Sequence, residues 1–342
     1  MKFLRRLCRD LAIDLGTANT LVYVVDVGIV ADEPSMVTVK TDSGNYLAFG
    51  HEAKEMRGRT APKVSVISPL KAGVIHDFKT ASALVNHLVG KSRGWGSRPF
   101  KGRVLVGVPA KASSVEERAI LEAAELAGGG EVYIVDEPFA AAIGAGLPVS
   151  EARGSMIMDI GGGTTNLALV SLSGTIYADS VPFAGNRMDE SIIEYIRKVH
   201  SIVIGEDTAE RIKIEIGSAQ EQKHNPELTI SGRHLVSGLP TAVKISQREV
   251  VLALKTTLDE IKKAVYRAFE STPPELMADL VDRGLYVVGG GSLLRDFDLW
   301  LAREVEVPVT RVERPLTAVV DGQARILAEW DKYRHLLRSR HI

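Results

Sequence analysis

Residues 159–166 read DIGGGTTN and lie between two apolar runs, MIM before them and LALV after them. The same plan occurs earlier in the chain, because residues 11–24 read LAIDLGTANTLVYV where residues 156–169 read MIMDIGGGTTNLAL. Each copy predicts a strand, an Asp-x-Gly turn that ends in threonine, and a second strand. The matching positions are Asp14 with Asp159, Gly16 with Gly161, and Thr20 with Thr165. The copies are too far apart for a solenoid repeat, so they predict two similar halves, each beginning with this hairpin.

The residue types of the two turns suit a phosphate group. Glycine allows a positive φ and lets a ligand approach without meeting a Cβ, and successive N–H groups form a concave anion site. Hydroxyl donors are added by Thr17, Thr20, Thr164 and Thr165. An aspartate beside a phosphate is repelled unless a divalent cation lies between them, and Mg²⁺ takes few carboxylates plus phosphate oxygens. Two such turns predict a clamp on a Mg-nucleotide polyphosphate, whereas one alone is most simply an ordinary tight hairpin.

The composition is that of a globular protein with room for two domains. The chain has 342 residues, of which 45% are hydrophobic and 25% charged, enough for two ordinary domains or one bilobed fold. The 42 basic and 43 acidic residues nearly cancel, which gives no support for nucleic acid as a partner. Cys8 is the only cysteine, which excludes an intramolecular disulfide and a cysteine-rich zinc site and fits a reducing, cytoplasmic compartment.

The N-terminal stretch MKFLRRLCRDL has the pattern of a short amphipathic helix. At about 100° per residue, its apolar side chains fall on one side and its cations on the other. The apolar side comprises Phe3, Leu4, Leu7, Cys8 and Leu11, and the basic side Lys2, Arg5, Arg6 and Arg9. Such a segment can lie in the headgroup region with its cations on anionic lipid. The alternative is a frayed basic tail before the first strand.

Two further segments suit nucleotide contacts. A third glycine run, LYVVGGGSLL at 285–294, follows an apolar strand and precedes a helical stretch, and helix N-termini approached by glycine favour such contacts. The stretch TAERIKIEIGSA at 208–219 reads as a helix start with Thr208 as N-cap. Glu210 and Lys213 lie one turn apart on one face of that helix. The alternative for this pair is a solvated salt bridge.

Six motifs together resemble the MreB family of bacterial actins: DLGTANT, DEPFAAAIGAGLP, DIGGGTT, TAERIKIEIG, ELMADLVDRGLYVVGGGSLL and PLTAVVDG. The Asp-x-Gly turns alone would indicate only the wider superfamily of actin, Hsp70 and sugar kinases. The resemblance implies an α/β, actin-like ATPase fold of two lobes, each with a large and a small subdomain, and a nucleotide in the cleft between them. The resemblance implies a basic amphipathic segment at 1–9. Lobe I comprises 10–150 plus 315–342, with its small subdomain at about 33–70. Lobe II comprises 151–314, with its small subdomain at about 186–248.

The resemblance also implies which residues hold ATP or GTP and Mg²⁺, without distinguishing the two nucleotides. The first phosphate turn is Asp14, Gly16, Thr17, Ala18 and Asn19, and the second is Gly161, Gly162, Gly163 and Thr164. Asp14 and Asp159 lie near the metal. The adenosine is flanked on one side by Glu210, Arg211, Ile212 and Lys213, and on the other by Gly290, Gly291, Ser292 and Leu293.

Hydrolysis needs a water aligned with the γ-phosphate and an acceptor that orients it. The strand VYIVDEP ends in two carboxylates, and by the resemblance Glu137 positions the water, with Asp159 beside it at the metal. The alternative is that Asp136 and Glu137 only favour a helix N-terminus. Members of the family usually carry Glu directly after the Thr-Thr pair, where this chain has Asn166. Because an amide cannot take a proton or carry charge, Asn166 predicts slower hydrolysis with phosphate binding retained; the alternative is a neutral change.

The functional expectation is a polymerising ATPase. The resemblance implies head-to-tail, paired filaments on the inner face of the cytoplasmic membrane, which organise the cell-wall elongation machinery and maintain rod shape. The loop GKSRGWGSRPFKGR at 90–103 carries Trp95 and Phe100 among cations, as expected of a membrane-contacting loop, although Pro99 stands where a second apolar residue is common. The alternatives are a specialised filament for plasmid or organelle positioning, and a small-molecule kinase of the same superfamily.

Overall fold

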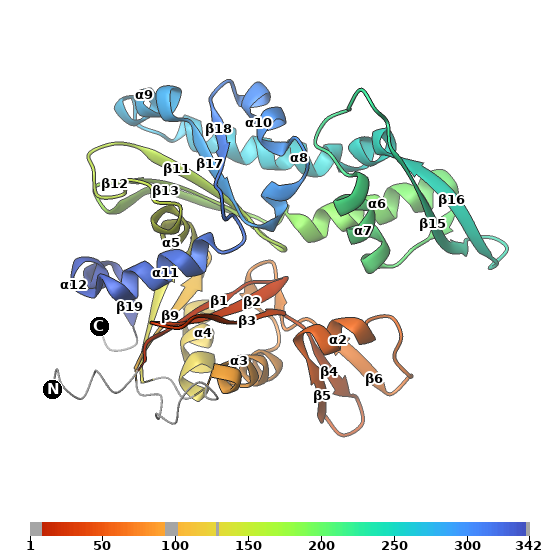
Figure 1. Cartoon of the computed structure of the whole chain (residues 1–342), viewed down its shortest axis with the longest axis horizontal. Coiled ribbons are helices and arrows are strands. Elements are labelled where there is room, and N and C mark those ends of the chain that lie inside the picture. The colour runs from red at the N-terminus through yellow and green to blue at the C-terminus, as the bar shows by residue number, and fades with distance from the viewer. Residues whose placement is uncertain (1–8, 93–101, 128–129, 340–342) are drawn as a thin grey trace.

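The computed structural model describes residues 9–92, 102–127 and 130–339. Two lobes lie side by side, each built around a large β-sheet with helices against it (Figure 1). The α/β class predicted from the sequence is therefore confirmed. Within the described residues, no helix is both long enough and apolar enough to cross a bilayer. The predicted membrane contacts Phe3, Leu4, Leu7, Trp95 and Phe100 lie outside the described residues.

The sheet of the first lobe has six strands. Their order is β19 (Arg338–Ser339), β10 (Glu131–Asp136), β9 (Arg103–Val108), β1 (Leu11–Leu15), β2 (Asn19–Val24) and β3 (Gly28–Pro34). Strands β1, β9 and β10 are parallel and nearly continuous in apolar residues, as expected of strands covered on both faces. Helices α3 (Phe78–Ser92) and α4 (Ser114–Leu126) contribute to the core on one face, and α4 begins at a capping box formed by Ser113 and Glu116.

The second lobe repeats this plan with five strands. Their order is β13 (Gly174–Val181), β12 (Thr165–Ser171), β11 (Ser155–Ile160), β17 (Leu285–Val288) and β18 (Val309–Arg311). The helices packed against this sheet are α8 (Gln247–Glu270), α9 (Pro274–Arg283) and α10 (Phe297–Val305), and α6 (Gly185–His200) packs on α8. Both predicted hairpins are present, because β1 pairs with β2 and β11 pairs with β12 in antiparallel register.

Two helices cross between the lobes. α5 (Glu137–Gly144) leads from the first sheet to the second, and α11 (Ala318–Ala328) leads back, through α12 (Trp330–Tyr333) and η3 (Arg334–Leu336), to β19. They pack on each other and against both sheets in one apolar core. A Cβ at Gly144 or Gly322 would overlap a backbone carbonyl oxygen of the other helix, so only glycine allows this close crossing.

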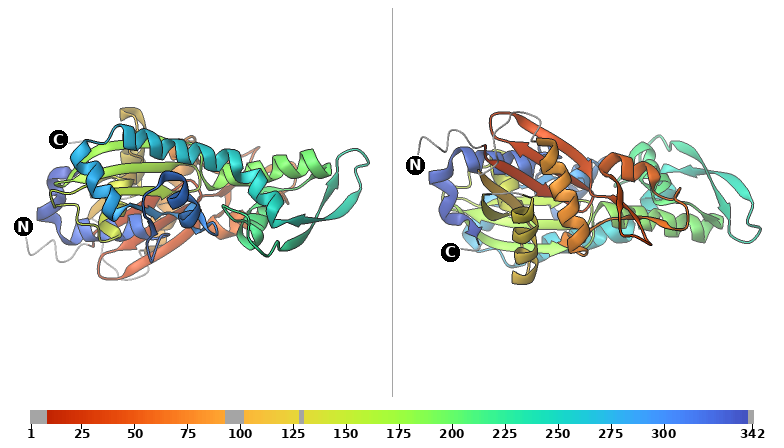
Figure 2. Two further views of the ribbon diagram at one scale, coloured as in Figure 1. Left: turned by 90° about the horizontal axis from the view of Figure 1, so that it is seen from above. Right: turned by 90° about the horizontal axis from the view of Figure 1, so that it is seen from below.

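Two smaller sheets extend from the same side of the molecule, beyond the large sheets (Figure 2). One consists of β5 (Tyr46–Phe49), β4 (Val37–Lys40), β6 (Val64–Ile67) and helix α2 (Gly50–Met56), and the other of β14 (Ile202–Val203), β15 (Glu227–His234), β16 (Pro240–Ser246) and helix α7 (Glu206–Ile216). The short ribbon β7 (Leu70–Lys71) and β8 (Val74–Ile75) follows the first of them. The subdomain boundaries given above stay a prediction.

Candidate functional site

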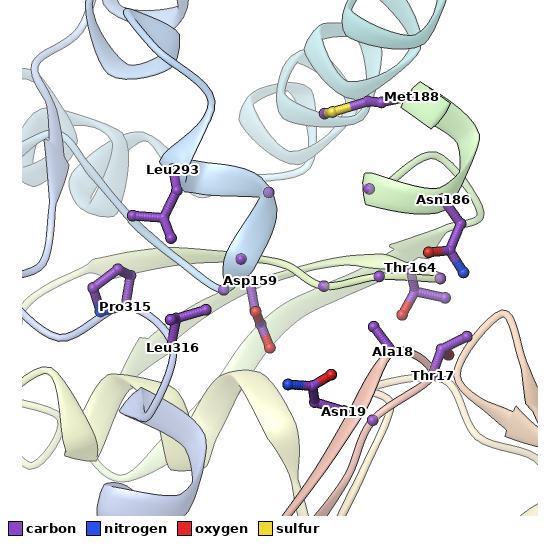
Figure 3. A pocket seen from close by; sticks show the side chains of 18 of the residues that line it. Thr17, Ala18, Asn19, Asp159, Thr164, Asn186, Met188, Leu293, Pro315 and Leu316 are labelled. Atoms are coloured by element: carbon purple, nitrogen blue, oxygen red, sulfur yellow. The ribbon is translucent and has the colours of Figure 1, made fainter. Parts of the chain in front are cut away.

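A cavity of about 520 Å³ lies between the lobes, where the two Asp-Gly turns meet. In Figure 3, Thr17, Ala18 and Asn19 of the first turn lie opposite Asp159 and Thr164 of the second. The two turns therefore converge on one space, although each belongs to a different sheet.

The first turn connects β1 to β2 and is held in place by hydrogen bonds from residues outside the turn. The Ser35 hydroxyl donates to the carbonyl oxygen of Gly16 at 2.6 Å and lies 2.8 Å from the Thr20 hydroxyl oxygen. The Thr17 hydroxyl oxygen accepts a hydrogen bond from the backbone N–H of Gly73 at 2.9 Å. These contacts fix the turn that follows Asp14, a residue of β1 that lines the cavity.

The second turn is closed on itself and joined to a helix. The N–H of Gly161 donates to the carbonyl oxygen of Thr164 at 2.9 Å. The carbonyl oxygens of Gly161 and Gly162 accept from the N–H groups of Gly185 and Asn186, at 3.1 and 2.8 Å. The N-terminus of α6 is thus attached to this turn, and a helix N-terminus favours a negatively charged ligand.

Glycine is required in the second turn for space rather than for backbone conformation. None of Gly161, Gly162 and Gly163 has a positive φ, in contrast to the conformational freedom expected from the sequence. A Cβ at Gly163 would come within 2.9 Å of the Thr17 Cβ, and one at Gly162 within 3.2 Å of the Ala18 backbone nitrogen. Larger residues would therefore push the two turns apart.

The third glycine run does use a left-handed conformation. Gly289 has φ 78°, and a Cβ there would overlap the side chain of Asp159 and the backbone of Ile160. The run continues as the short 3₁₀ helix η2 (Gly290–Leu293) before α10, which agrees with the predicted strand, turn and helical stretch.

Acidic side chains dominate the electrostatics of the cavity. Burial, followed by the nearby charges of Asp159 and Asp32, raises the pKa of Asp14 to about 7. Burial raises the pKa of Asp159 to about 6. The pKa of Glu137 is raised well above its usual range by burial and then by the neighbouring carboxylates. Such a cluster favours either bound protons or a cation.

This donor set is compatible with Mg²⁺ shared between protein and phosphate. Carboxylate oxygens of Asp14 and Asp159 are suitable ligands, one from each turn. Among the described residues, no group of three or more His, Cys, Asp or Glu side chains is placed to hold a metal ion. A cation at this position would therefore take its remaining ligands from phosphate oxygens and water, as Mg²⁺ commonly does.

Glu137 and Asn166 lie in direct contact. Glu137 begins α5, and Asn166 lies on β12 with its side chain 2% exposed. The Asn166 amide nitrogen donates to the Glu137 carboxylate at 3.0 Å, and the Asn166 amide oxygen accepts from the Ser180 hydroxyl at 2.7 Å. Both side chains line the cavity. The structure thus brings together the two residues predicted to affect hydrolysis.

Helix α7 forms the far wall. It begins at Glu206 with Gly205 as N-cap, so the predicted N-cap at Thr208 is wrong: the acidic residues before it already form the first turn. Lys213 does not pair with Glu210; its ammonium group contacts Asp189 at 2.9 Å and the carbonyl oxygen of Gly185 at 3.0 Å. Both Glu210 and Lys213 face the cavity.

Three ion pairs join α2 and the residue that follows it to α7 across the cleft. Lys54 contacts Glu210 at 2.9 Å, and Arg57 contacts Glu206 at 2.8 Å and also Asp207. We call these five residues the cleft latch. They connect the parts that carry the two smaller sheets, through helices α2 and α7, which lie opposite each other in Figure 1.

Most residues predicted from the sequence line the cavity. Those that do are Asp14, Gly16, Thr17, Ala18, Asn19, Glu137, Asp159, Gly161, Gly162, Gly163, Thr164, Asn166, Glu210, Lys213, Gly290, Gly291 and Leu293. Arg211, Ile212 and Ser292 do not: Arg211 points toward Glu215, Ile212 is buried in the core, and the Ser292 hydroxyl bonds the carbonyl oxygen of Gly289.

Further residues, which were not predicted from the sequence, also line the cavity. They are Leu21, Asp32, Gly73, Gly185, Asn186, Met188, Asp189, Ile214, Gly289, Leu294, Arg295, Pro315, Leu316 and Val319. Gly289 opens the quoted glycine run, and Pro315 and Leu316 open the motif PLTAVVDG, so those motifs carried a signal. Ile214 likewise lies within the quoted motif TAERIKIEIG, whereas Asp189 lies in none of the quoted motifs, because helix packing alone brings it to this wall.

A family model described as MreB/Mbl protein matches residues 8–335. The chain is 46% identical over 336 residues to the cell shape-determining protein MreB of Escherichia coli strain K12, covering 97% of each chain. It is 43% identical over 326 residues to the cell shape-determining protein Mbl of Bacillus subtilis strain 168, covering 95% of this chain and 97% of that one.

Solved structures give the same answer for the fold. MreB5 of Spiroplasma citri bound to AMPPNP superimposes with a TM-score of 0.91 at 34% identity, covering 96% of this chain and 98% of that one. A double helical filament of MamK superimposes with a TM-score of 0.80 at 24% identity, covering 94% and 98%. The predicted actin-like fold is thereby confirmed.

Proposed function

The chain belongs to the MreB/Mbl family, and on this premise we propose that it is a nucleotide-dependent, membrane-associated, actin-like filament protein that organises cell-wall elongation and maintains rod shape. Its place is the cytoplasm, at the inner face of the membrane. Its partners are further copies of itself, joined head to tail in paired protofilaments, and the cell-wall elongation machinery.

One observation carries the proposal: two Asp-Gly turns, one from each lobe, meet across a cavity between the lobes. A polyphosphate bound there would contact both lobes at once, so binding would stabilise one arrangement of the lobes over others. That coupling is what a filament controlled by its nucleotide requires. The relative from Spiroplasma citri, solved with AMPPNP and with ADP, supports a nucleotide as the ligand.

In the proposed site, ATP lies with its phosphates between the two turns. Asp14 and Asp159 hold Mg²⁺, which neutralises phosphate charge when bound. N–H groups of the two turns donate to the phosphate oxygens, and Glu210 and Gly290 flank the adenosine. GTP fits the same phosphate contacts.

Hydrolysis is assigned to Glu137, which accepts a hydrogen bond from the attacking water and orients it. Asn166 keeps one carboxylate oxygen of Glu137 occupied by its amide nitrogen. An amide cannot accept the proton that a carboxylate could. We therefore propose slow turnover, with nucleotide binding retained.

Contacts at the ends of the two predicted membrane segments, 1–9 and 90–103, support the proposal that both lie on one membrane-facing side. Residue 102 packs against the backbone of Arg9, and the Asp10 carboxylate accepts from the Arg103 backbone N–H at 2.7 Å and from its Nε at 2.9 Å. Arg9, the last residue of the N-terminal segment, therefore lies beside the C-terminal end of the loop at 90–103. Two weak membrane contacts on one side of a filament reinforce each other by avidity.

The test combines purified protein, Mg-ATP and liposomes that contain anionic lipid. Phosphate release and electron micrographs of the vesicles are recorded from the same samples. We expect filaments on the vesicles and slow phosphate release. Absence of filaments with any nucleotide would refute the polymer assignment.

Two other functions share this fold. A specialised filament for plasmid or organelle positioning would leave cell shape intact when the protein is depleted, whereas the proposed function predicts its loss. A small-molecule kinase would transfer the phosphate to an acceptor, which a screen of candidate acceptors with labelled ATP would detect.

A further inference from the structure

Ser180 lies directly opposite Asn166 in the antiparallel ladder between β12 and β13. Residues paired in this way place their side chains on the same face of a sheet. The hydroxyl of Ser180 donates to the amide oxygen of Asn166 at 2.7 Å, and the amide nitrogen of Asn166 donates to Glu137 at 3.0 Å. The three residues form one chain of hydrogen bonds that ends at the carboxylate facing the cavity.

The two ends of an asparagine amide differ in chemistry but hardly in shape, so hydrogen-bond partners decide its orientation. A carboxylate accepts and cannot donate, so Glu137 selects the nitrogen end of Asn166. The oxygen end then needs a donor, and at 2% exposure the side chain has little access to water. Ser180 supplies that donor.

Ser180 can act in this way because its backbone is held independently of its hydroxyl. The Asp179 carboxylate accepts from the Ser180 backbone N–H at 3.0 Å and from the Lys111 ammonium group at 2.7 Å. The same carboxylate accepts from Arg267 at 3.1 Å. Removing the hydroxyl therefore leaves the strand in place and removes one hydrogen bond.

We infer that Ser180 is a positioning residue for hydrolysis, which holds the Asn166 amide as a donor to Glu137 and so keeps the Glu137 carboxylate aimed at the attacking water. The inference rests on the proposed function, because it concerns the ATPase site described above. Without the Ser180 hydroxyl, the Asn166 amide keeps a single partner and loses its fixed rotamer. Glu137 then samples orientations that do not align water.

The experiment measures single-turnover phosphate release at saturating Mg-ATP, together with nucleotide affinity. Ser180→Ala is expected to slow release about 5- to 10-fold, the effect of one lost hydrogen bond to a buried group, with affinity unchanged. Ser180→Thr keeps the hydroxyl and is expected to restore the rate. Thr175→Ala removes an exposed hydroxyl from the same strand and serves as the matched control.

A double-mutant comparison tests whether the effect passes through Asn166. In an Asn166→Ala background, Ser180→Ala is expected to cause no further loss. The inference is overturned if Ser180→Ala releases phosphate at the wild-type rate, or if it slows release equally in the Asn166→Ala background. Wild-type protein that releases no phosphate would instead overturn the proposed function, and this inference with it.

Discussion

Replacing Asn166 by Glu would test how this site controls turnover. The side chain is buried, and its amide nitrogen lies 3.0 Å from a carboxylate oxygen of Glu137. The variant Asn166→Glu places a second carboxyl group beside the first. Asn166→Gln has the length of Glu without its charge, so it is the matched control for size.

The magnitude follows from Coulomb's law. Two carboxylates about 4 Å apart repel by about 4 kcal/mol at an effective dielectric constant of about 20, which corresponds to roughly 3 pKa units. One of the two carboxyl groups in Asn166→Glu therefore holds a proton at neutral pH. The protonated group can donate to its partner as the amide does now, and the pair can accept a proton from water. The repulsion also lowers the ligand-free free energy of unfolding.

We expect Asn166→Glu to release phosphate at least about 10-fold faster than wild type, because general-base catalysis typically contributes 10²–10⁴-fold and Glu137 supplies part of it already. Single-turnover release with saturating Mg-ATP measures this, and thermal unfolding without nucleotide measures the stability cost. The reasoning is refuted if Asn166→Glu binds Mg-ATP normally but hydrolyses it no faster than Asn166→Gln.

The other predictions concern pH, the cleft latch and the interlobe helices. The pKa of Asp14 is about 7 in the folded chain and 3.8 in the unfolded chain. Between these pH values the folded, ligand-free protein binds more protons than the unfolded chain, so its free energy of unfolding falls as pH rises. Thermal unfolding across this range measures the effect, and a stability that increases with pH would contradict the prediction. Mg-nucleotide binding should release protons below about pH 7, as calorimetry in buffers of different ionisation enthalpy would detect. Arg57→Glu should speed release of a fluorescent nucleotide, since a surface ion pair contributes about 0.2–1 kcal/mol, and adding Glu206→Arg should slow it again, because Arg57 and Glu206 form an ion pair and neither residue lines the cavity. Equal rates in all variants would exclude the latch. Gly322→Ala should lower the free energy of unfolding by about 1–3 kcal/mol through overpacking. Gly90→Ala is the control and should not lower it, because a Cβ at Gly90 meets open space. Denaturant unfolding of both variants measures the difference.

Local sequence patterns were sufficient for the parts of the site that lie within single motifs. The hairpin at 159–166, its earlier copy, and the apolar strand that leads into Glu137 were each predicted and are each present. Their signals are the continuous apolar runs and the turn residues of a few consecutive positions, and these do not depend on the rest of the chain. The same motifs carried the family resemblance, and with it most of the residues that line the cavity.

The contacts between motifs were decided by the tertiary structure. Nothing in the sequence places Ser180 on the amide of Asn166, because that contact follows from the pairing of β13 with β12. Glu210 and Lys213 both face the cavity as predicted, but the alternative of a salt bridge between them is wrong, because α6 packs close enough for Asp189 to contact Lys213. The requirement for glycine in the second turn also comes from outside that turn. Gly162 and Gly163 are needed because residues of the opposite lobe leave no room for a Cβ. Sequence patterns predict what a segment forms, while the space and partners around it are set by residues far away in the chain.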